Sequence, residues 1–138
     1  MKDIPIVDAL IIGGGPAGLT TALTLARQLH TCVVFDSKKY RNDGTPHMHT
    51  VITWDHKDPT DFRTAARKNI LSSYKTVQFA DLEVTGIQST KDQNGNSLFT
   101  LVDEKGDTWV GRKLVLAMGV TDVLPPIDGY DECWRKGM

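Results

Sequence analysis

The stretch that decides the fold of this 138-residue chain is Gly13-Gly14-Gly15-Pro16-Ala17-Gly18, which matches the pattern Gly-x-Gly-x-x-Gly. Residues 7–12 directly before it form an apolar run, which predicts a strand buried on both faces. From Pro16 onward, apolar residues recur at helical spacing as far as Leu29, and proline is well tolerated in a first helical turn. Residues 31–35 predict a second buried strand. The sequence therefore predicts a β–α–β unit with a right-handed crossover.

This glycine turn has the sequence context of a dinucleotide-binding site. Gly13 permits a tight turn, Gly15 lets the backbone approach a pyrophosphate, and Gly18 allows the helix to pack closely on the strand. The helix N-terminus adds unpaired N–H groups and positive potential. Asp36 follows the second strand, where a carboxylate accepts hydrogen bonds from ribose hydroxyls and disfavours a 2′-phosphate. The pattern alone does not separate FAD from NAD, and a glycine turn without a ligand is the alternative.

The rest of the chain predicts a long loop, a second helix and further strands. Residues 37–58 have few periodic apolar side chains and predict a loop of a length that often carries function. Asp58-Pro59 predicts the start of a helix. Its buried side is expected at Phe62, Ala65, Ala66, Ile70 and Tyr74. Strands are predicted at 77–79, 82–87, 97–103, 108–110 and 114–118, of which the middle three form a meander with turns at Asn94-Gly95 and Lys105-Gly106-Asp107.

Composition narrows the class of protein. The formal net charge is −1, so there is no basic excess of the kind that nucleic-acid binding requires, and no apolar run is long enough to cross a bilayer. The N-terminal residues lack a signal-peptide pattern, which predicts a cytoplasmic protein. The two cysteines form no Cys-x-x-Cys pair; Cys32 is expected to be a buried apolar residue, and Cys133 is given no redox role. Three tryptophans without shared periodicity, Trp54, Trp109 and Trp134, are expected to pack separately.

Histidines gather in the long loop. His47 and His49 would share one face of an extended segment, and Asp55-His56 follows further along. His49 is a candidate for a catalytic acid or base, because imidazole titrates near neutral pH; the alternative is a histidine that hydrogen-bonds the loop or a cofactor. A metal site needs three or four ligands with a supporting shell, which loop histidines alone do not establish, so no metal is expected.

Beyond the glycine turn, several segments form a combination that is specific to one family. They are Phe35-Asp36-Ser37, Tyr40-Arg41-Asn42, His47-Met48-His49, Phe62-Arg63-Thr64-Ala65-Ala66-Arg67, Leu114-Val115-Leu116-Ala117-Met118-Gly119-Val120, Asp122-Val123-Leu124-Pro125, Ile127-Asp128-Gly129-Tyr130 and Trp134. With these segments the chain resembles the N-terminal FAD-binding part of thioredoxin-reductase-like pyridine nucleotide-disulfide oxidoreductases (class II). Within that family it is most similar to the branch that includes fungal dithiol oxidases.

The resemblance implies an α/β, Rossmann-like FAD-binding domain, with a parallel sheet, flanking helices and a three-stranded antiparallel meander. The cofactor-binding residues that it implies are Gly13, Gly14, Gly15, Pro16, Ala17, Gly18, Asp36, Ser37, Arg41, His49, Val84, Ala117 and Gly119. In the family, the residue that matches Val84 contacts adenine, and the loop that matches His49 faces the flavin. The strand that ends in Ala117 and Gly119 is expected to pass near the cofactor.

The resemblance also implies a domain organisation and a function. Residues 1–138 are expected to form one FAD-binding domain, with the NADPH and Cys-x-x-Cys domain and the C-terminal FAD segment absent, because the chain stops before the expected cysteine pair. The implied function is an FAD-dependent oxidoreductase of secondary-metabolite biosynthesis, without its own redox dithiol, acting on a small-molecule substrate. The alternatives are a non-redox enzyme that reuses the cofactor cleft, a partner-dependent subunit, and an inactive remnant. A partly uncovered sheet exposes apolar surface, so a homo-oligomer or a partner chain is expected.

Overall fold

A single mixed sheet of six strands organises the molecule, in the order β3-β2-β1-β6-β5-β4. The computed structural model describes residues 5–134. The elements, in chain order, are β1 (Ile6–Ile12), α1 (Pro16–Arg27), β2 (Cys32–Phe35), α2 (Pro59–Ser73), β3 (Val77–Ala80), β4 (Val84–Lys91), β5 (Ser97–Asp103), β6 (Thr108–Leu116) and α3 (Tyr130–Cys133). The strands β3, β2, β1 and β6 run parallel, and β4 and β5 complete the antiparallel meander with β6. The predicted Rossmann-like fold is confirmed.

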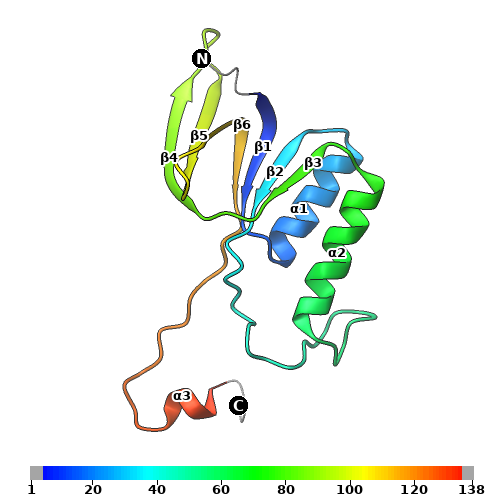
Figure 1. Cartoon of the computed structure of the whole chain (residues 1–138), viewed down its shortest axis with the longest axis vertical. Helices are drawn as coiled ribbons and strands as arrows, with labels where there is room; N and C mark the ends of the chain where they lie inside the picture. The colour runs from blue at the N-terminus through cyan, green and yellow to red at the C-terminus, as the bar shows by residue number, and fades with distance from the viewer. Residues whose placement is uncertain (1–4, 135–138) are drawn as a thin grey trace.

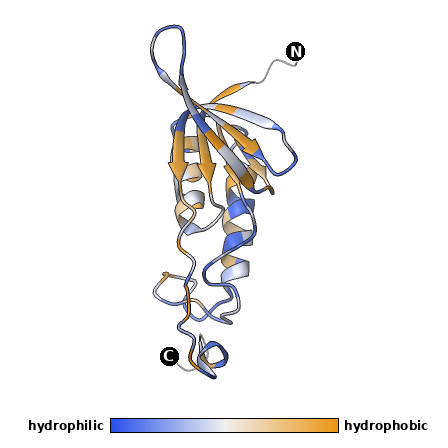
Figure 2. Ribbon diagram, turned by 90° about the vertical axis from the view of Figure 1, so that its left-hand side faces the viewer, coloured by the Kyte–Doolittle hydropathy of each residue, from blue (hydrophilic) through white to orange (hydrophobic). Residues whose placement is uncertain are grey.

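The central parallel strands are buried on both faces. The helices α1 and α2 lie side by side over one face (Figure 1), where Ile11 and Val34 pack against Leu19 and Ile70. Leu10, which directly precedes Ile11 in β1, points to the opposite face and packs with Phe35 and Leu101. This alternation is the two-residue period of a strand, and it explains why β1 and β2 read as continuous apolar runs. The hydrophobic colouring of Figure 2 gathers in these strands.

The β–α–β unit has the predicted order, with one difference at the end of its helix. α1 starts at Pro16 as expected and ends at Arg27, with Gln28 as its C-cap. Leu29 was expected on the buried side of the helix, but it is 79% exposed and has φ +62°. The chain reverses here toward β2 through backbone bonds from Leu29 and His30 to the last turn of α1, so the helical period stops before Leu29.

The prediction of two separate strands at 108–110 and 114–118 is wrong, because β6 runs unbroken from Thr108 to Leu116. Residues 108–111 pair antiparallel with β5, and residues 110–116 lie along the parallel pairing with β1, with Leu114 opposite Leu10. Val110 and Gly111 therefore have a partner on both sides. Gly111 lies in the middle, where a Cβ atom would collide with the Leu10 side chain. The glycine therefore permits close packing in a continuous strand rather than a turn.

The remaining elements largely follow the prediction. α2 begins at Pro59 with Asp58 as its N-cap, whose side chain accepts a hydrogen bond from Thr60 N. Ile70 is buried, and the other expected apolar positions, Phe62, Ala65, Ala66 and Tyr74, are half-buried. Gly95 and Gly106 occupy the two predicted turns with φ +82° and +83°.

After β6 the chain leaves the sheet in an irregular segment that ends in α3 (Figure 1). An extended connection was expected over residues 124–130, and the short helix Tyr130–Cys133 was not. Within the described part of the chain, residues 5–134, no helix has both the length and the apolar character needed to cross a membrane.

Candidate functional site

A crevice is built where the parallel strands β1, β2 and β6 reach their carboxyl ends. Here Gly13 N donates to Phe35 O at 2.8 Å, and Ala117 N donates to Ile12 O at 2.8 Å. Asp36 N donates to the Ala80 carbonyl at 2.9 Å. The residue that follows each strand is thus fixed to a neighbouring strand. β1 also lies between β2, which follows it through α1, and β6, which is reached from the other side, and this is the position at which open α/β sheets bind ligands.

Three of the four glycines in the turn are packed against protein. Gly13 has φ +118°, and a Cβ atom there would collide with the carbonyl of Ala117. A Cβ on Gly18 would collide with the Gly13 carbonyl, which confirms its predicted packing role. A Cβ on Gly14 would collide with the carboxyl group of Asp36. These contacts bring the start of α1, the end of β2 and the end of β6 together around one turn.

Gly15 is different, because a Cβ atom there would have no protein atom within 4 Å. It is the N-cap of α1 and has extended backbone angles, φ −78° and ψ −176°. Among the described residues no side chain caps this helix, and its first turn contains no acidic residue. The N–H groups of the first turn and the positive end of the helix therefore face an approachable surface, which is the local requirement for binding a phosphate.

Asp36 lies at this turn as a carboxylate that is only 5% exposed. Its oxygens accept hydrogen bonds from the backbone N–H of Lys38 at 3.0 Å, the Lys38 ammonium at 3.1 Å and the Tyr40 hydroxyl at 2.6 Å. Burial and the hydrogen bond to Asp36 raise the pKa of Tyr40, so its hydroxyl stays protonated as a donor. The carboxylate is thus held in a fixed orientation beside Gly14.

Arg63 supports this arrangement from α2 and was not predicted as a buried residue. Its guanidinium stacks on the Tyr40 ring with 3.8 Å to the centroid, and it donates to Asn42 Oδ1 at 2.8 Å and to Asp43 Oδ1 at 3.1 Å. The side chain is 8% exposed. The sequence does carry a signal, because residues 59, 63 and 70 are the buried positions of α2 and share one helical face. Hydropathy alone does not reveal an arginine on that face.

A pocket of about 170 Å³ opens beside Gly14 and Asp36. Lys38 and Tyr40 from the loop line it, as do Arg63 and Arg67 from α2. Arg67 stacks on the Phe79 ring at 4.5 Å from the centroid. The pocket combines one fixed acceptor, an aromatic face and three cationic side chains that each form an ion pair with Asp36, Asp43 or Asp81. It can therefore receive a polar or planar group.

The other predicted cofactor residues lie around this crevice in different settings. Arg41 forms a bidentate ion pair with Asp122, with both nitrogen–oxygen distances 3.0 Å, and so joins the long loop to the segment after β6. Ser37 is exposed directly after Asp36, and Val84 is half-buried at the start of β4. Gly119 has φ +68° with open space at its Cβ position.

The structure brings His49 together with Asp55 and His56 rather than with His47. His49 Nδ1 lies 3.4 Å from the Asp55 carboxylate, and His56 Nε2 lies 3.3 Å from it. The sequence does not indicate that these three residues form a group, because the loop closure that joins them leaves no periodic signal. His47 is exposed.

Cys32 and the tryptophans lie as expected. Cys32 is 1% exposed, and burial raises the pKa of its thiol to about 11. Cys133 is exposed, and both cysteines are free thiols. Each tryptophan has its own aromatic partner: Trp54 contacts Phe62, Trp109 contacts Phe35, and Trp134 stacks on Tyr130.

Comparisons with known proteins agree with this fold. The family model described as pyridine nucleotide-disulphide oxidoreductase matches residues 7–137. The chain is 50% identical over 135 residues to the thioredoxin reductase aclD of Aspergillus oryzae, covering 97% of this chain and 41% of that protein. It is 50% identical over 138 residues to the thioredoxin reductase tcpT of Claviceps purpurea, covering 100% of this chain and 42% of the relative.

Among solved structures, the chain is similar to the crystal structure of the putative thioredoxin reductase TrxB from Bacillus anthracis. The TM-score is 0.84 at 30% sequence identity, and the match covers 94% of this chain and 42% of that one. The chain therefore spans about two fifths of the length of the relatives that it matches.

Proposed function

The chain belongs to the pyridine nucleotide-disulphide oxidoreductase family, and from this premise we propose that it holds the ADP half of FAD in a thioredoxin-reductase-like flavoprotein. The observation that carries the proposal is the contrast within the glycine turn. Gly13, Gly14 and Gly18 are packed against protein, whereas Gly15 is open at the N-terminus of α1. A ligand pyrophosphate is the group that fits such an opening.

The residues divide by the part of the cofactor that they would hold. The glycine turn, Gly13, Gly14, Gly15, Pro16, Ala17 and Gly18, would hold the pyrophosphate. Asp36 would accept from the ribose hydroxyls, and its fixed carboxylate would disfavour a 2′-phosphate. Ser37 and Arg41 would serve the adenosine, and Val84 the adenine. His49, Ala117 and Gly119 would serve the flavin side. These assignments rest on the family resemblance, and the glycine turn and Asp36 also rest on their positions after β1 and β2.

The chain's own residues bind and orient, while FAD, when bound, supplies hydride and electron transfer. The N–H groups at the start of α1 would donate to phosphate oxygens. Asp36 would accept from the ribose only if it keeps its orientation, which Tyr40 and the Lys38 backbone provide. The Lys38 ammonium is the more exposed partner of Asp36, with a side chain that is 49% exposed, so it is the contact that a ribose can displace.

We further propose that the complete protein is an FAD-dependent oxidoreductase that acts on a small molecule in secondary-metabolite biosynthesis. The similarity to fungal proteins named thioredoxin reductase supports an oxidoreductase, and the branch-specific segments support the biosynthetic role. The free thiols of Cys32 and Cys133 suit the cytosol, to which we assign the protein. Exposed apolar side chains after β6, including Met118, Val120 and Val123, support a homo-oligomer or a partner chain.

The test is a titration of the chain with FAD, with Gly15→Ala as the decisive variant. The added methyl group meets no protein atom, so the fold stays intact while the approach of a pyrophosphate is blocked. We expect FAD affinity to fall at least about tenfold, the equivalent of about 1.4 kcal/mol, and ADP to compete with FAD for the wild-type chain. The matched control is Gly95→Asn at the β4–β5 turn, because asparagine tolerates the left-handed backbone there. Equal affinity in wild type and Gly15→Ala would refute the assignment.

A further inference from the structure

The long loop between β2 and α2 closes on itself at residues 48–57. Met48 N donates to the Lys57 carbonyl at 2.8 Å, and His56 N donates to the Met48 carbonyl at 2.9 Å, so the two ends of the segment are bridged. Trp54 packs edge-to-face on Phe62 of α2, with 5.6 Å between ring centroids. These contacts anchor the segment at its ends and against α2, which fixes the spacing of the side chains that it carries.

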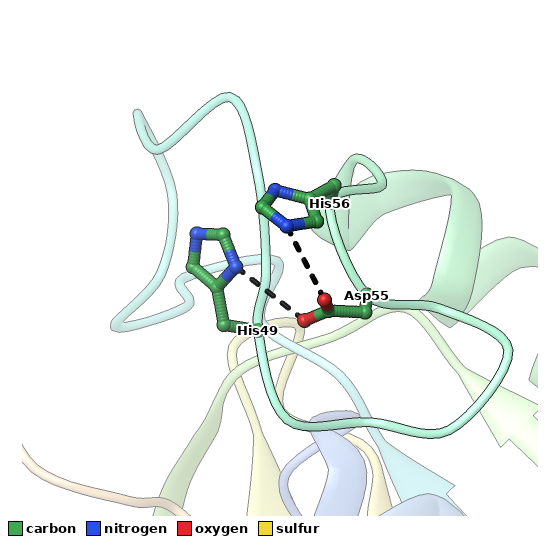
Figure 3. A group of neighbouring side chains, drawn as sticks. All are labelled: His49, Asp55 and His56. Carbon is green, nitrogen blue, oxygen red and sulfur yellow. Dashed lines mark ion pairs between the residues drawn. The ribbon is translucent and has the colours of Figure 1, made fainter.

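Three of those side chains are metal-ligating types that point toward one another (Figure 3). His49 Nδ1 lies 3.4 Å from Asp55 Oδ1, and His56 Nε2 lies 3.3 Å from Asp55 Oδ2. One ligand atom from each of the three residues lies within 4.8 Å of the other two. Two ligands at about 2.0–2.1 Å from a tetrahedral zinc ion are about 3.3–3.4 Å apart, which is close to each imidazole–carboxylate separation. The two imidazoles face different oxygens of Asp55, so the three side chains must close from separations of up to 4.8 Å to hold one ion.

Asp55 is the acidic member of this group, and a backbone hydrogen bond orients its carboxylate. The Thr50 backbone N–H donates to Asp55 Oδ1 at 3.0 Å. A metal-ligating carboxylate commonly has an outer hydrogen bond of this kind, which fixes its orientation toward the ion.

We propose that His49, Asp55 and His56 form a binding site for a divalent first-row transition metal such as Zn²⁺. Two imidazoles and one carboxylate are a ligand set that zinc takes, and it leaves at least one coordination position for water or an external ligand. The side chains are 57%, 52% and 76% exposed, so the ion reaches them directly from solvent. Bound metal would connect the two sides of the closed segment and fix the ring of His49.

The test is isothermal titration of the purified full chain with Zn²⁺ at neutral pH, repeated with Mg²⁺. We expect one Zn²⁺ per chain and no comparable Mg²⁺ binding, since Mg²⁺ prefers oxygen ligands. His56→Asn and Asp55→Asn should each weaken Zn²⁺ binding at least about tenfold. Asp55→Asn is conservative, because the amide oxygen can still accept from Thr50 N. His47→Asn, an exposed histidine of the same loop, is the matched control and should leave binding unchanged.

Circular dichroism melting of each variant shows that the fold is retained, which we expect because all three ligands are exposed. Zn²⁺ uptake that survives both His56→Asn and Asp55→Asn, or that falls equally in His47→Asn, would overturn the site, as would the absence of stoichiometric uptake. The metal titrations use the chain without added FAD, so their outcome is separate from that of the FAD titration.

Discussion

At the scale of single residues, Asp103 shows how one side chain can organise a turn. It ends β5, is only 1% exposed, and accepts hydrogen bonds from Trp109 Nε1 at 2.9 Å, Lys105 N at 2.9 Å and Asp107 N at 3.0 Å. These bonds, with Trp109 the largest contributor, hold the pKa of Asp103 below its ordinary value despite burial. In the sequence, an acidic residue close to Lys105-Gly106 indicates only a turn. The burial of Asp103 depends on its contact with Trp109, which the sequence does not show.

Replacement of Asp103 by asparagine should therefore destabilise the chain. The amide oxygen can replace the acceptor for the two backbone N–H groups, but the amide NH₂ group cannot accept from Trp109, which leaves a buried donor unpaired. We expect a loss of about 1–3 kcal/mol in the free energy of unfolding at pH 7, measured by urea titration. Asp107→Asn, which removes the same charge from an exposed side chain, should change stability little.

The stability gap between wild type and Asp103→Asn should also depend on pH. Because the folded-state pKa of Asp103 is lower than its unfolded value, the stabilisation is complete above the unfolded pKa and is lost as the pH falls through the folded pKa. Urea midpoints from pH 6 to pH 2 should converge for the two proteins at the acid end. A gap that stays constant across this range would contradict the role given to the carboxylate.

At the scale of elements, the sequence is most informative where a local pattern alone determines the structure. The β–α–β unit follows from an apolar run, a glycine turn and helical spacing. The observed bounds of β1, α1 and β2 agree closely with those predictions. The continuity of β6 could not be predicted from a local pattern, because it depends on pairing with two strands, β5 and β1, that lie far apart from each other in the sequence. In the sequence, Gly111 favours the end of a strand. Only the structure shows that a glycine is needed there because the Leu10 side chain lies beside it. The closure of the long loop between Met48 and Lys57 is formed within an irregular segment, so no periodic pattern in the sequence indicates it.

The continuity of β6 predicts a single protected segment in native-state hydrogen exchange. Amides that pair with β5 and those that pair with β1 belong to one strand, so their opening free energies should be similar across residues 109–115. The measurement is hydrogen exchange followed by NMR. Fast exchange at residues 111–113 between two protected stretches would contradict this prediction and would indicate two separate strands.

At the scale of the whole molecule, apolar side chains are unevenly distributed over the surface. The segment after β6 exposes Met118 by 62%, Val120 by 60%, Val123 by 92% and Ile127 by 61%. Exposed apolar positions in succession are typical of a surface that another chain covers. The fold class and the position of the glycine turn could be predicted from the sequence, whereas this exposure depends on where the segment runs relative to the sheet.

We predict that the chain self-associates or requires a partner through this segment. Light scattering should give a mass above that of one chain, and Val120→Asp with Val123→Asp should lower it without lowering the melting temperature. Ile52→Asp is the control, because Ile52 is 90% exposed but lies in the long loop. A wild-type chain that is monodisperse at the mass of one chain would contradict the prediction.

We propose above that this chain binds FAD at the glycine turn, where Gly15 leaves open space at the N-terminus of α1. The most direct measurement is the visible absorption spectrum of the full chain, incubated with FAD and then passed through gel filtration. We expect flavin absorbance to co-elute with the protein at nearly one flavin per chain in wild type and to be largely lost in Gly15→Ala. A folded wild-type chain that elutes without flavin would contradict the claim and would favour a cleft that binds another small molecule.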